Sequence, residues 1–214
     1  MIGRAFVATI AISFGLAGCG GSSTPTRAKT TAHPSRNALP TPEQLRPTVL
    51  TADDLGAGWT EIELENPAGQ ICGIQPLAAA GTTKSRASFG RSDDQAAVFR
   101  AGVTAYPKGT ATGAVSTLRA ATAACSSYRL ASTDAKGAAT ETRVDVRTLD
   151  VGELGEERLG LRLSVPSLKQ VILYAVVRRG DVVTALAQSA EKPDVAAFTA
   201  IVAKADTRLA KLVP

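Results

Sequence analysis

The chain has 214 residues, of which 44% are hydrophobic, 4% aromatic and 20% charged, and its formal net charge is +5. A basic chain suggests nucleic-acid binding, but the excess charge lies outside the long C-terminal part. Residues 19–48 carry a net charge of +3, whereas residues 49–214 carry 19 basic and 18 acidic side chains. We therefore expect no nucleic-acid partner, and we expect the basic segment to lie near anionic lipid head groups.

The first nineteen residues have the three parts of a secretory signal. A short segment with Arg4 precedes a mostly apolar run over residues 5–15, and the tetrapeptide Leu-Ala-Gly-Cys ends at Cys19. This pattern is typical of bacterial lipoproteins, in which the chain is cut before the cysteine and the thiol takes a diacylglycerol. The apolar run is shorter than the ~20 residues that span a bilayer. We predict a signal peptide over residues 1–18, and the alternative is a plain secretory signal in which Cys19 is incidental.

Lipid on Cys19 would hold the mature protein on the extracytoplasmic face of the cell membrane. Residues 20–48 are rich in Gly, Ser, Thr and Pro and almost free of large apolar side chains. Such a segment cannot bury enough surface to offset its ordering entropy. We therefore predict a disordered tether over residues 19–48. The only histidine of the chain, His33, is interpreted as a solvated residue of this tether.

Residues 49–214 are long enough for one domain with its own core. Apolar alternation and turn-rich gaps predict strands over residues 59–65, 85–90 and 96–106. Apolar residues at spacings of three and four then predict a helix from Thr110 or Thr112 to Tyr128.

Four more strands and a helix are predicted in the C-terminal half of the chain. The strands cover residues 140–149, 157–165, 170–178 and 182–188, and their short separations favour antiparallel pairing. The helix runs from Asp194 to Leu212, with charges at its ends that suit the helix dipole. The order of elements predicts an α+β domain in which two main helices pack against a single antiparallel sheet.

The chain contains three cysteines. If Cys19 carries lipid, Cys72 and Cys125 remain in one domain in an oxidising compartment. A disulfide between them is the simplest interpretation, and it would tie the loop after the first strand to the first helix. Two free thiols or a redox pair are the alternatives, although the close C-x-x-C spacing of redox pairs is absent.

The predicted domain lacks a recognisable catalytic set. Residues 49–214 contain no histidine, which removes the usual Ser-His-Asp, Cys-His and histidine-metal arrangements, and no P-loop, G-x-G-x-x-G or G-x-S-x-G pattern occurs. Acidic pairs at residues 53–54, 93–94 and 156–157 lie in predicted turns or strand entries, where carboxylates are commonly capping or solvated groups. We therefore predict no enzyme activity, no cofactor and no metal site.

The tripeptide Arg179-Gly180-Asp181 matches an adhesion motif, but it lies between two predicted strands. It is interpreted as a hairpin turn, in which Gly180 supplies the positive φ. Arg178 and Arg179 are interpreted as charges that protect a sheet edge, and the alternative is a small anion-binding patch.

The segment VLTADDLGAGW over residues 49–59 and the segment VVRRGDVV over residues 176–183 carry a family resemblance. Together with a strand that reaches a tyrosine and a helix with a cysteine, they resemble actinobacterial lipoproteins related to the extracellular sensor domain of the PknH kinase. The resemblance extends over most of residues 49–212. It implies an α+β domain with a cleft for an unidentified ligand, and it supplies no catalytic residues.

The leading hypothesis is a non-enzymatic, surface-anchored domain that binds a small molecule, a lipid or an envelope component. The alternative is a protein-interaction module that modulates an envelope partner, and a carboxylate-dependent hydrolase is a third, remote option. An apolar cavity of several hundred Å³ would favour a ligand, whereas an exposed apolar patch would favour a protein partner.

Overall fold

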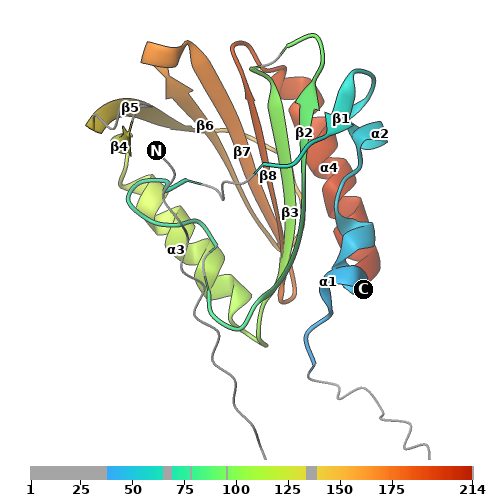
Figure 1. Ribbon diagram of the computed structural model, residues 1–214. Helices are drawn as coiled ribbons and strands as arrows, with labels where there is room; N and C mark the ends of the chain where they lie inside the picture. The colour runs from blue at the N-terminus through green and yellow to red at the C-terminus, as the bar shows by residue number, and fades with distance from the viewer. Residues whose placement is uncertain (1–37, 65–68, 78, 95, 134–138, 214) are drawn as a thin grey trace, which may run out of the picture. The chain divides into compact units, whose positions relative to one another are not determined.

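A computed structural model describes residues 38–213, apart from residues 65–68, 78, 95 and 134–138. The described residues form an antiparallel sheet of eight strands in the order β1-β2-β3-β8-β7-β6-β5-β4 (Figure 1). The strands are β1 (Trp59–Glu61), β2 (Thr83–Arg91), β3 (Val98–Ala105), β4 (Ser127–Thr133), β5 (Ala139–Thr148), β6 (Glu157–Val165), β7 (Gln170–Arg179) and β8 (Val182–Ala190). The predicted α+β fold with a single antiparallel sheet is confirmed.

The helices are unequal in length. The long helices are α3 (Ala111–Ala123) and α4 (Val195–Leu212), and the short ones are α1 (Pro42–Leu45), η1 (Arg46–Thr48), α2 (Ala52–Leu55) and η2 (Pro166–Leu168). Asp194 caps α4, since its carboxylate accepts from the amides of the second and third helical residues. No helix in the described part of the chain combines the length and apolar character that a membrane span requires.

The two long helices lie on opposite faces of the sheet (Figure 1). Alternation along β7 separates the two layers, because successive strand residues point to opposite faces. Leu173, Ala175 and Val177 pack on the α4 side, whereas Tyr174 and Val176 pack on the α3 side. β7 is therefore buried on both faces, and the domain has three layers.

The folded region begins before the predicted boundary at Val49. Leu45 is fully buried in the α4-side core and Leu39 packs against that core. Thr41 forms a capping box with Gln44 at the start of α1. The predicted tether is therefore too long at its C-terminal end, because Leu39 and Leu45, in a Pro- and Thr-rich segment, pack into the core of the domain.

The first long helix is shorter than predicted. It ends at Ala123, Cys125 lies in the following turn, and Tyr128 belongs to β4, where it pairs with Val144. Tyr128 nevertheless packs on the same apolar cluster as Val115 of the helix. The apolar spacing that predicted a longer helix therefore arises because α3 and the start of β4 contribute side chains to the same core, although Tyr128 is not part of the helix.

Candidate functional site

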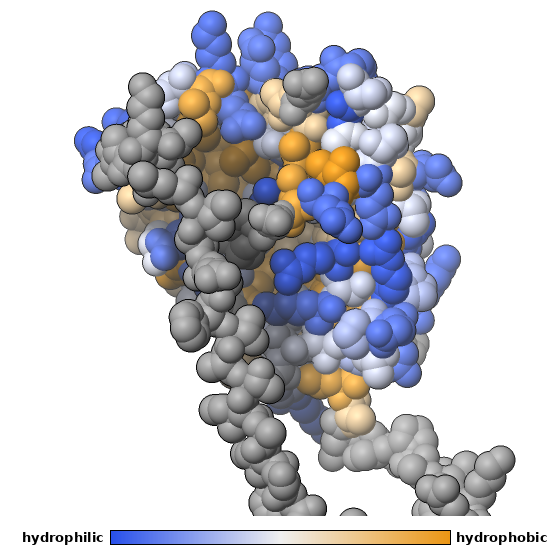
Figure 2. All heavy atoms as spheres, viewed as in Figure 1, coloured by the Kyte–Doolittle hydropathy of each residue, from blue (hydrophilic) through white to orange (hydrophobic). Residues whose placement is uncertain are grey.

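A cleft of about 350 Å³ lies on the face of the sheet that carries α3. α3 packs against β6 and β7, and the remainder of this face, toward β2 and β3, forms the floor of the cleft. The loop of residues 69–77 and the beginning of β4 form its walls. Figure 2 shows hydrophobic surface in a hollow of this face, with hydrophilic side chains beside it over β2 and β3.

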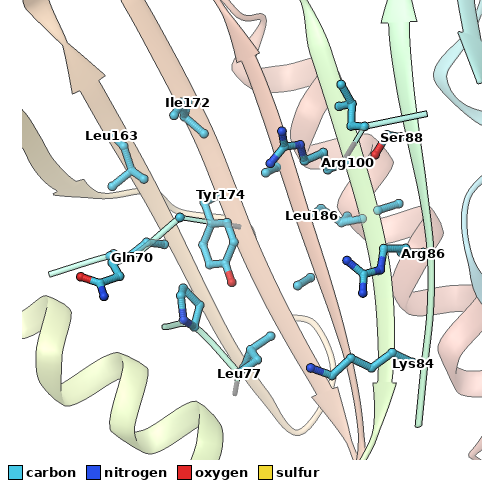
Figure 3. A pocket seen from close by; sticks show the side chains of 18 of the residues that line it. Gln70, Leu77, Lys84, Arg86, Ser88, Arg100, Leu163, Ile172, Tyr174 and Leu186 are labelled. Atoms are coloured by element: carbon cyan, nitrogen blue, oxygen red, sulfur yellow. The ribbon is translucent and has the colours of Figure 1, made fainter. Parts of the chain in front are cut away.

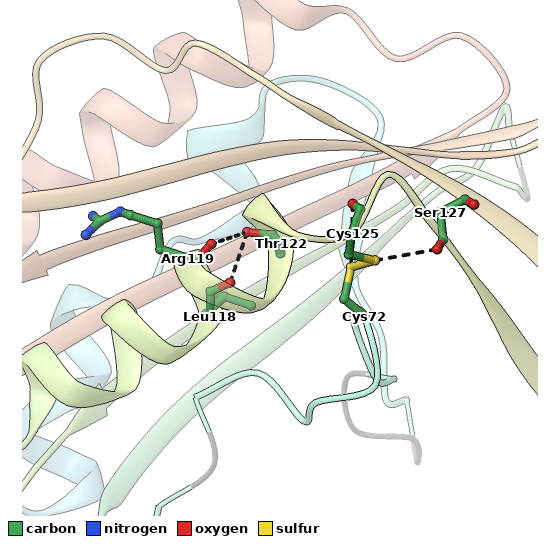
Figure 4. The surroundings of a disulfide bond; sticks show 6 residues. All are labelled: Cys72, Leu118, Arg119, Thr122, Cys125 and Ser127. Atoms are coloured by element: carbon green, nitrogen blue, oxygen red, sulfur yellow. Dashed lines mark hydrogen bonds between the residues drawn. A yellow bond between two sulfur atoms is a disulfide. The ribbon is translucent and has the colours of Figure 1, made fainter.

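Three contacts shape the loop that forms one wall. A disulfide joins Cys72 to Cys125, immediately before β4, with 6.0 Å between the Cα atoms (Figure 4). Ile71 and Ile74 pair through their backbones. The hydroxyl of Tyr106 donates to the carbonyl of Leu77 at 2.9 Å, and burial raises the pKa of Tyr106 to about 12, so the phenol stays protonated.

The backbone of this wall is unusual at two positions of the loop. Cys72 and Leu77 have positive φ angles of 51° and 57°, a conformation that costs free energy in residues other than glycine. The disulfide holds one of these residues and the Tyr106 hydroxyl holds the other. The disulfide and the Tyr106 hydrogen bond therefore support a backbone course that these two residues disfavour by themselves.

Residues with small side chains form part of the floor of the cleft. Gly102 of β3 lies opposite Ala185 of β8, and both line the cleft together with Ala187. A Cβ atom built on Gly102 would meet no heavy atom closer than 3.9 Å, so the backbone does not require glycine there. The larger apolar lining residues include Leu77, Tyr128, Leu130, Leu163, Ile172 and Tyr174.

One side of the cleft is cationic. Lys84 and Arg86 of β2 and Arg100 of β3 line it, and Figure 3 shows their charged ends pointing across the sheet toward Tyr174. Among the described residues, no carboxylate oxygen lies within 4.0 Å of these three cations, and the cleft lining contains no Asp or Glu. Burial raises the pKa of the Tyr174 phenol, which therefore remains a neutral donor.

The residues singled out from the sequence mostly have structural roles. The disulfide between Cys72 and Cys125 is present, whereas Cys19 and His33 lie outside the described residues. No cluster of three or more potential metal ligands occurs in the described ranges. Asp54, from the first acidic pair, caps α2 and forms an ion pair with Arg208 at 2.7 Å.

The second and third acidic pairs also have ordinary partners. Asp93 forms an ion pair with Arg91 at 2.5 Å, and Asp94 accepts from the amide of Ala96. The third pair, at residues 156–157, holds the guanidinium of Arg178. These carboxylates are therefore capping and ion-pairing groups; capping was predicted for these turns and strand entries, whereas the ion pairs were not.

Both interpretations of the arginines near the hairpin are wrong. β7 is an interior strand between β6 and β8, so Arg178 and Arg179 do not protect an edge. Arg178 pairs with Glu156 and Glu157, and Arg179 forms two 2.7 Å hydrogen bonds to Asp206, which leaves neither for a free anion-binding patch. Gly180 has the φ of 52° expected of the hairpin turn.

The family resemblance implied a cleft, but sequence reasoning neither located it nor identified its cations. Lys84, Arg86 and Ser88 alternate along β2 and therefore share one face, which is a signal readable from the sequence. The contribution of Arg100 depends on the register in which it faces Ser88, and the enclosure of this face depends on the distant disulfide.

No family model matches this chain, and no curated protein sequence matches it. Among solved structures, the extracellular domain of PknH from Mycobacterium tuberculosis aligns with a TM-score of 0.61 over 81% of this chain and 99% of that chain. The fold resembles that of the PknH extracellular domain. The identity is 12%, so the similarity concerns the fold alone and confirms the fold that the sequence resemblance implied.

Proposed function

We propose that this protein is a non-enzymatic, extracytoplasmic ligand-binding domain of the sensor type, anchored to the membrane through lipid on Cys19. The observation that carries the proposal is the cleft over β2, β3 and β8. Its volume of about 350 Å³ falls within the range of roughly 300–1,000 Å³ for small-molecule sites. Its lining combines apolar side chains with a few convergent polar groups, which is the usual composition of such sites.

The similarity to the extracellular domain of a kinase supports the sensor-like assignment, and the predicted lipoprotein signal supports the location. The alternative, a module that modulates an envelope protein, has no comparable feature in its favour. Among the described residues, the exposed large hydrophobic side chains are Leu64 and Leu168, and Leu64 belongs to the cleft lining. Isolated residues of this kind do not form a docking patch.

Native mass spectrometry of the protein purified from its own host tests ligand binding. We expect an added mass that denaturation releases. Gly102→Leu places a side chain in the cleft without backbone strain and should abolish the added mass. Ala200→Leu, a matched substitution on an exposed position of α4 across the sheet, should retain it. A wild-type protein with only the apo mass, or an added mass unaffected by Gly102→Leu, would contradict the proposal.

The anchor is tested separately. Growth with a fatty-acid probe should label the wild-type protein, and Cys19→Ser should remove the label because no acceptor thiol remains for the diacylglycerol. A wild-type protein that takes up no label would overturn the anchoring part of the proposal and leave the cleft unaffected.

A further inference from the structure

We propose that the cleft selects an anionic amphiphile, with the acidic head group against Lys84, Arg86 and Arg100 and the apolar chain against Leu163 and Ile172. This inference rests on the proposed function, because it names the chemical class of the ligand for the same cleft. The shared chemistry of the head group is a phosphate or a carboxylate on an apolar chain.

The strand register brings the three cations together. Arg86 lies opposite Gly102 and Arg100 lies opposite Ser88, so the two arginines are diagonal neighbours on one face of β2 and β3. Lys84 is two residues from Arg86 on the same face. Like charges at such positions repel one another, and no described carboxylate oxygen lies within 4.0 Å of any of the three.

Arginines elsewhere in the domain are neutralised more closely. Arg46, Arg91, Arg178, Arg179 and Arg208 each have a carboxylate oxygen within 2.9 Å. What distinguishes the cluster beside the cleft is that three cations without a described ion pair lie together on one face, in a domain whose total charge is close to neutral. A bound anion would remove the repulsion, and guanidinium groups form paired hydrogen bonds with phosphate and carboxylate oxygens.

The rest of the cleft is suited to an uncharged chain. Leu163, Ile172 and Leu130 face it from three strands, and Ala185 and Ala187 leave space above β8. Among the residues that the structure describes, the lining contains no acidic side chain, so they offer a cationic head group no counter-charge. A volume at the lower end of the range for ligand sites suits one chain better than a lipid with two.

Four probes separate the head group from the chain. These are oleoyl lysophosphatidic acid, oleate, neutral monooleoylglycerol and inorganic phosphate, and the three amphiphiles are titrated into the purified protein below their micellar concentrations. We expect the two anionic amphiphiles to bind at least about tenfold more tightly than monooleoylglycerol, a difference of about 1.4 kcal/mol. That preference should shrink when the ionic strength rises from about 0.1 M to about 1 M.

The variant Arg86→Gln/Arg100→Gln should remove the preference for anionic probes and leave the weaker binding of monooleoylglycerol within about twofold. Arg147→Gln is the matched control, because Arg147 is exposed on β5 and is likewise without a described ion pair. Thermal unfolding of each variant reports whether it is folded.

The outcomes distinguish this proposal from the proposed function. Equal affinity for oleate and monooleoylglycerol, unaffected by the double variant, would overturn the anionic head group while preserving a ligand-binding cleft. Binding of inorganic phosphate as tight as that of lysophosphatidic acid would identify a free anion site and overturn the amphiphile. Failure of all four probes would also overturn it, whereas ligand binding itself is judged by the mass added during purification.

Discussion

Removal of the disulfide should lower both stability and ligand affinity. The bridge joins cysteines that are 53 residues apart in the sequence. In the chain-entropy model, closing a loop of this length stabilises the folded state by about 4 kcal/mol at 25 °C. Whole domains have unfolding free energies of about 5–15 kcal/mol. Cys72→Ala/Cys125→Ala should therefore remain folded near room temperature while losing a large part of its stability.

The effect on the cleft follows from the position of the bridge. Without it, the wall formed by residues 69–77 is held mainly by the backbone pairing of Ile71 with Ile74 and by the Tyr106 hydrogen bond to Leu77. Apparent affinity falls in proportion to the fraction of molecules in the binding-competent conformation. If the freed loop is in place about a tenth of the time, the dissociation constant rises about tenfold.

Urea unfolding measures the first effect, with the fluorescence of Trp59, the only tryptophan, as the probe. Wild-type protein unfolded in reductant should match the double variant. Binding of the native ligand, or of the best anionic probe, measures the second effect. A stability loss below about 1 kcal/mol, or two alkylatable thiols in unreduced wild-type protein, would refute the reasoning.

Three further predictions concern the framework of the domain. Asp206→Ala should cost about 2–3 kcal/mol, because it leaves the half-buried guanidinium of Arg179 without its carboxylate partner. Gly160→Ala should cost about 3 kcal/mol, because the new Cβ would collide with the carbonyl of Leu149. Asp54→Asn should be less stable than the wild type at neutral pH, and this difference should shrink in acid, where the wild-type carboxylate is protonated. Urea unfolding measures all three effects.

The acid effect has a defined sign. Burial alone would raise the pKa of the Asp54 carboxyl, but its hydrogen bonds to Thr51 and the charges of Arg208 and Lys204 outweigh burial and lower that pKa. The stabilisation is fully present above the unfolded pKa of about 3.9. It is lost as the pH falls from there through the lowered pKa of the carboxyl in the folded protein. An Asp54→Asn penalty equal at about pH 2 and about pH 7 would contradict this account, and unaltered stability in Gly160→Ala or Asp206→Ala would contradict the other two.

The C-terminal half of the domain could be predicted closely because its local signals agree with its packing. The strand predicted over residues 157–165 is β6 itself, and β7, β8 and α4 differ from prediction by one to two residues at an end. In α4, Phe198, Val202 and Leu209 form a buried stripe at helical spacing. Short hairpins join β6, β7 and β8, so pairing of sequence neighbours determines this part of the sheet.

Elements whose structure depends on distant partners were missed. β4 lies at the sheet edge opposite β1 and pairs only with β5 among the named strands. Its polar composition gives little strand signal, and Tyr128 continues the apolar spacing of the preceding helix. Similarly, Leu45 looks like an isolated residue in a polar segment, yet it is fully buried. Apolar periodicity in a short stretch of sequence cannot indicate that a single apolar side chain packs into a core formed by distant residues.

The cleft depends on the same long-range pairing. Lys84 and Arg86 alternate with Ser85 and Ala87 along β2, a pattern that ordinarily indicates a strand with one solvated face. That face becomes the floor of a cleft because the chain crosses from β3 to the opposite edge at β4, and because the disulfide from Cys72 holds a loop beside it. The residues we assign to ligand selection are thus ordinary surface cations in the sequence, and only the position of β4 and the disulfide place them beside a cleft.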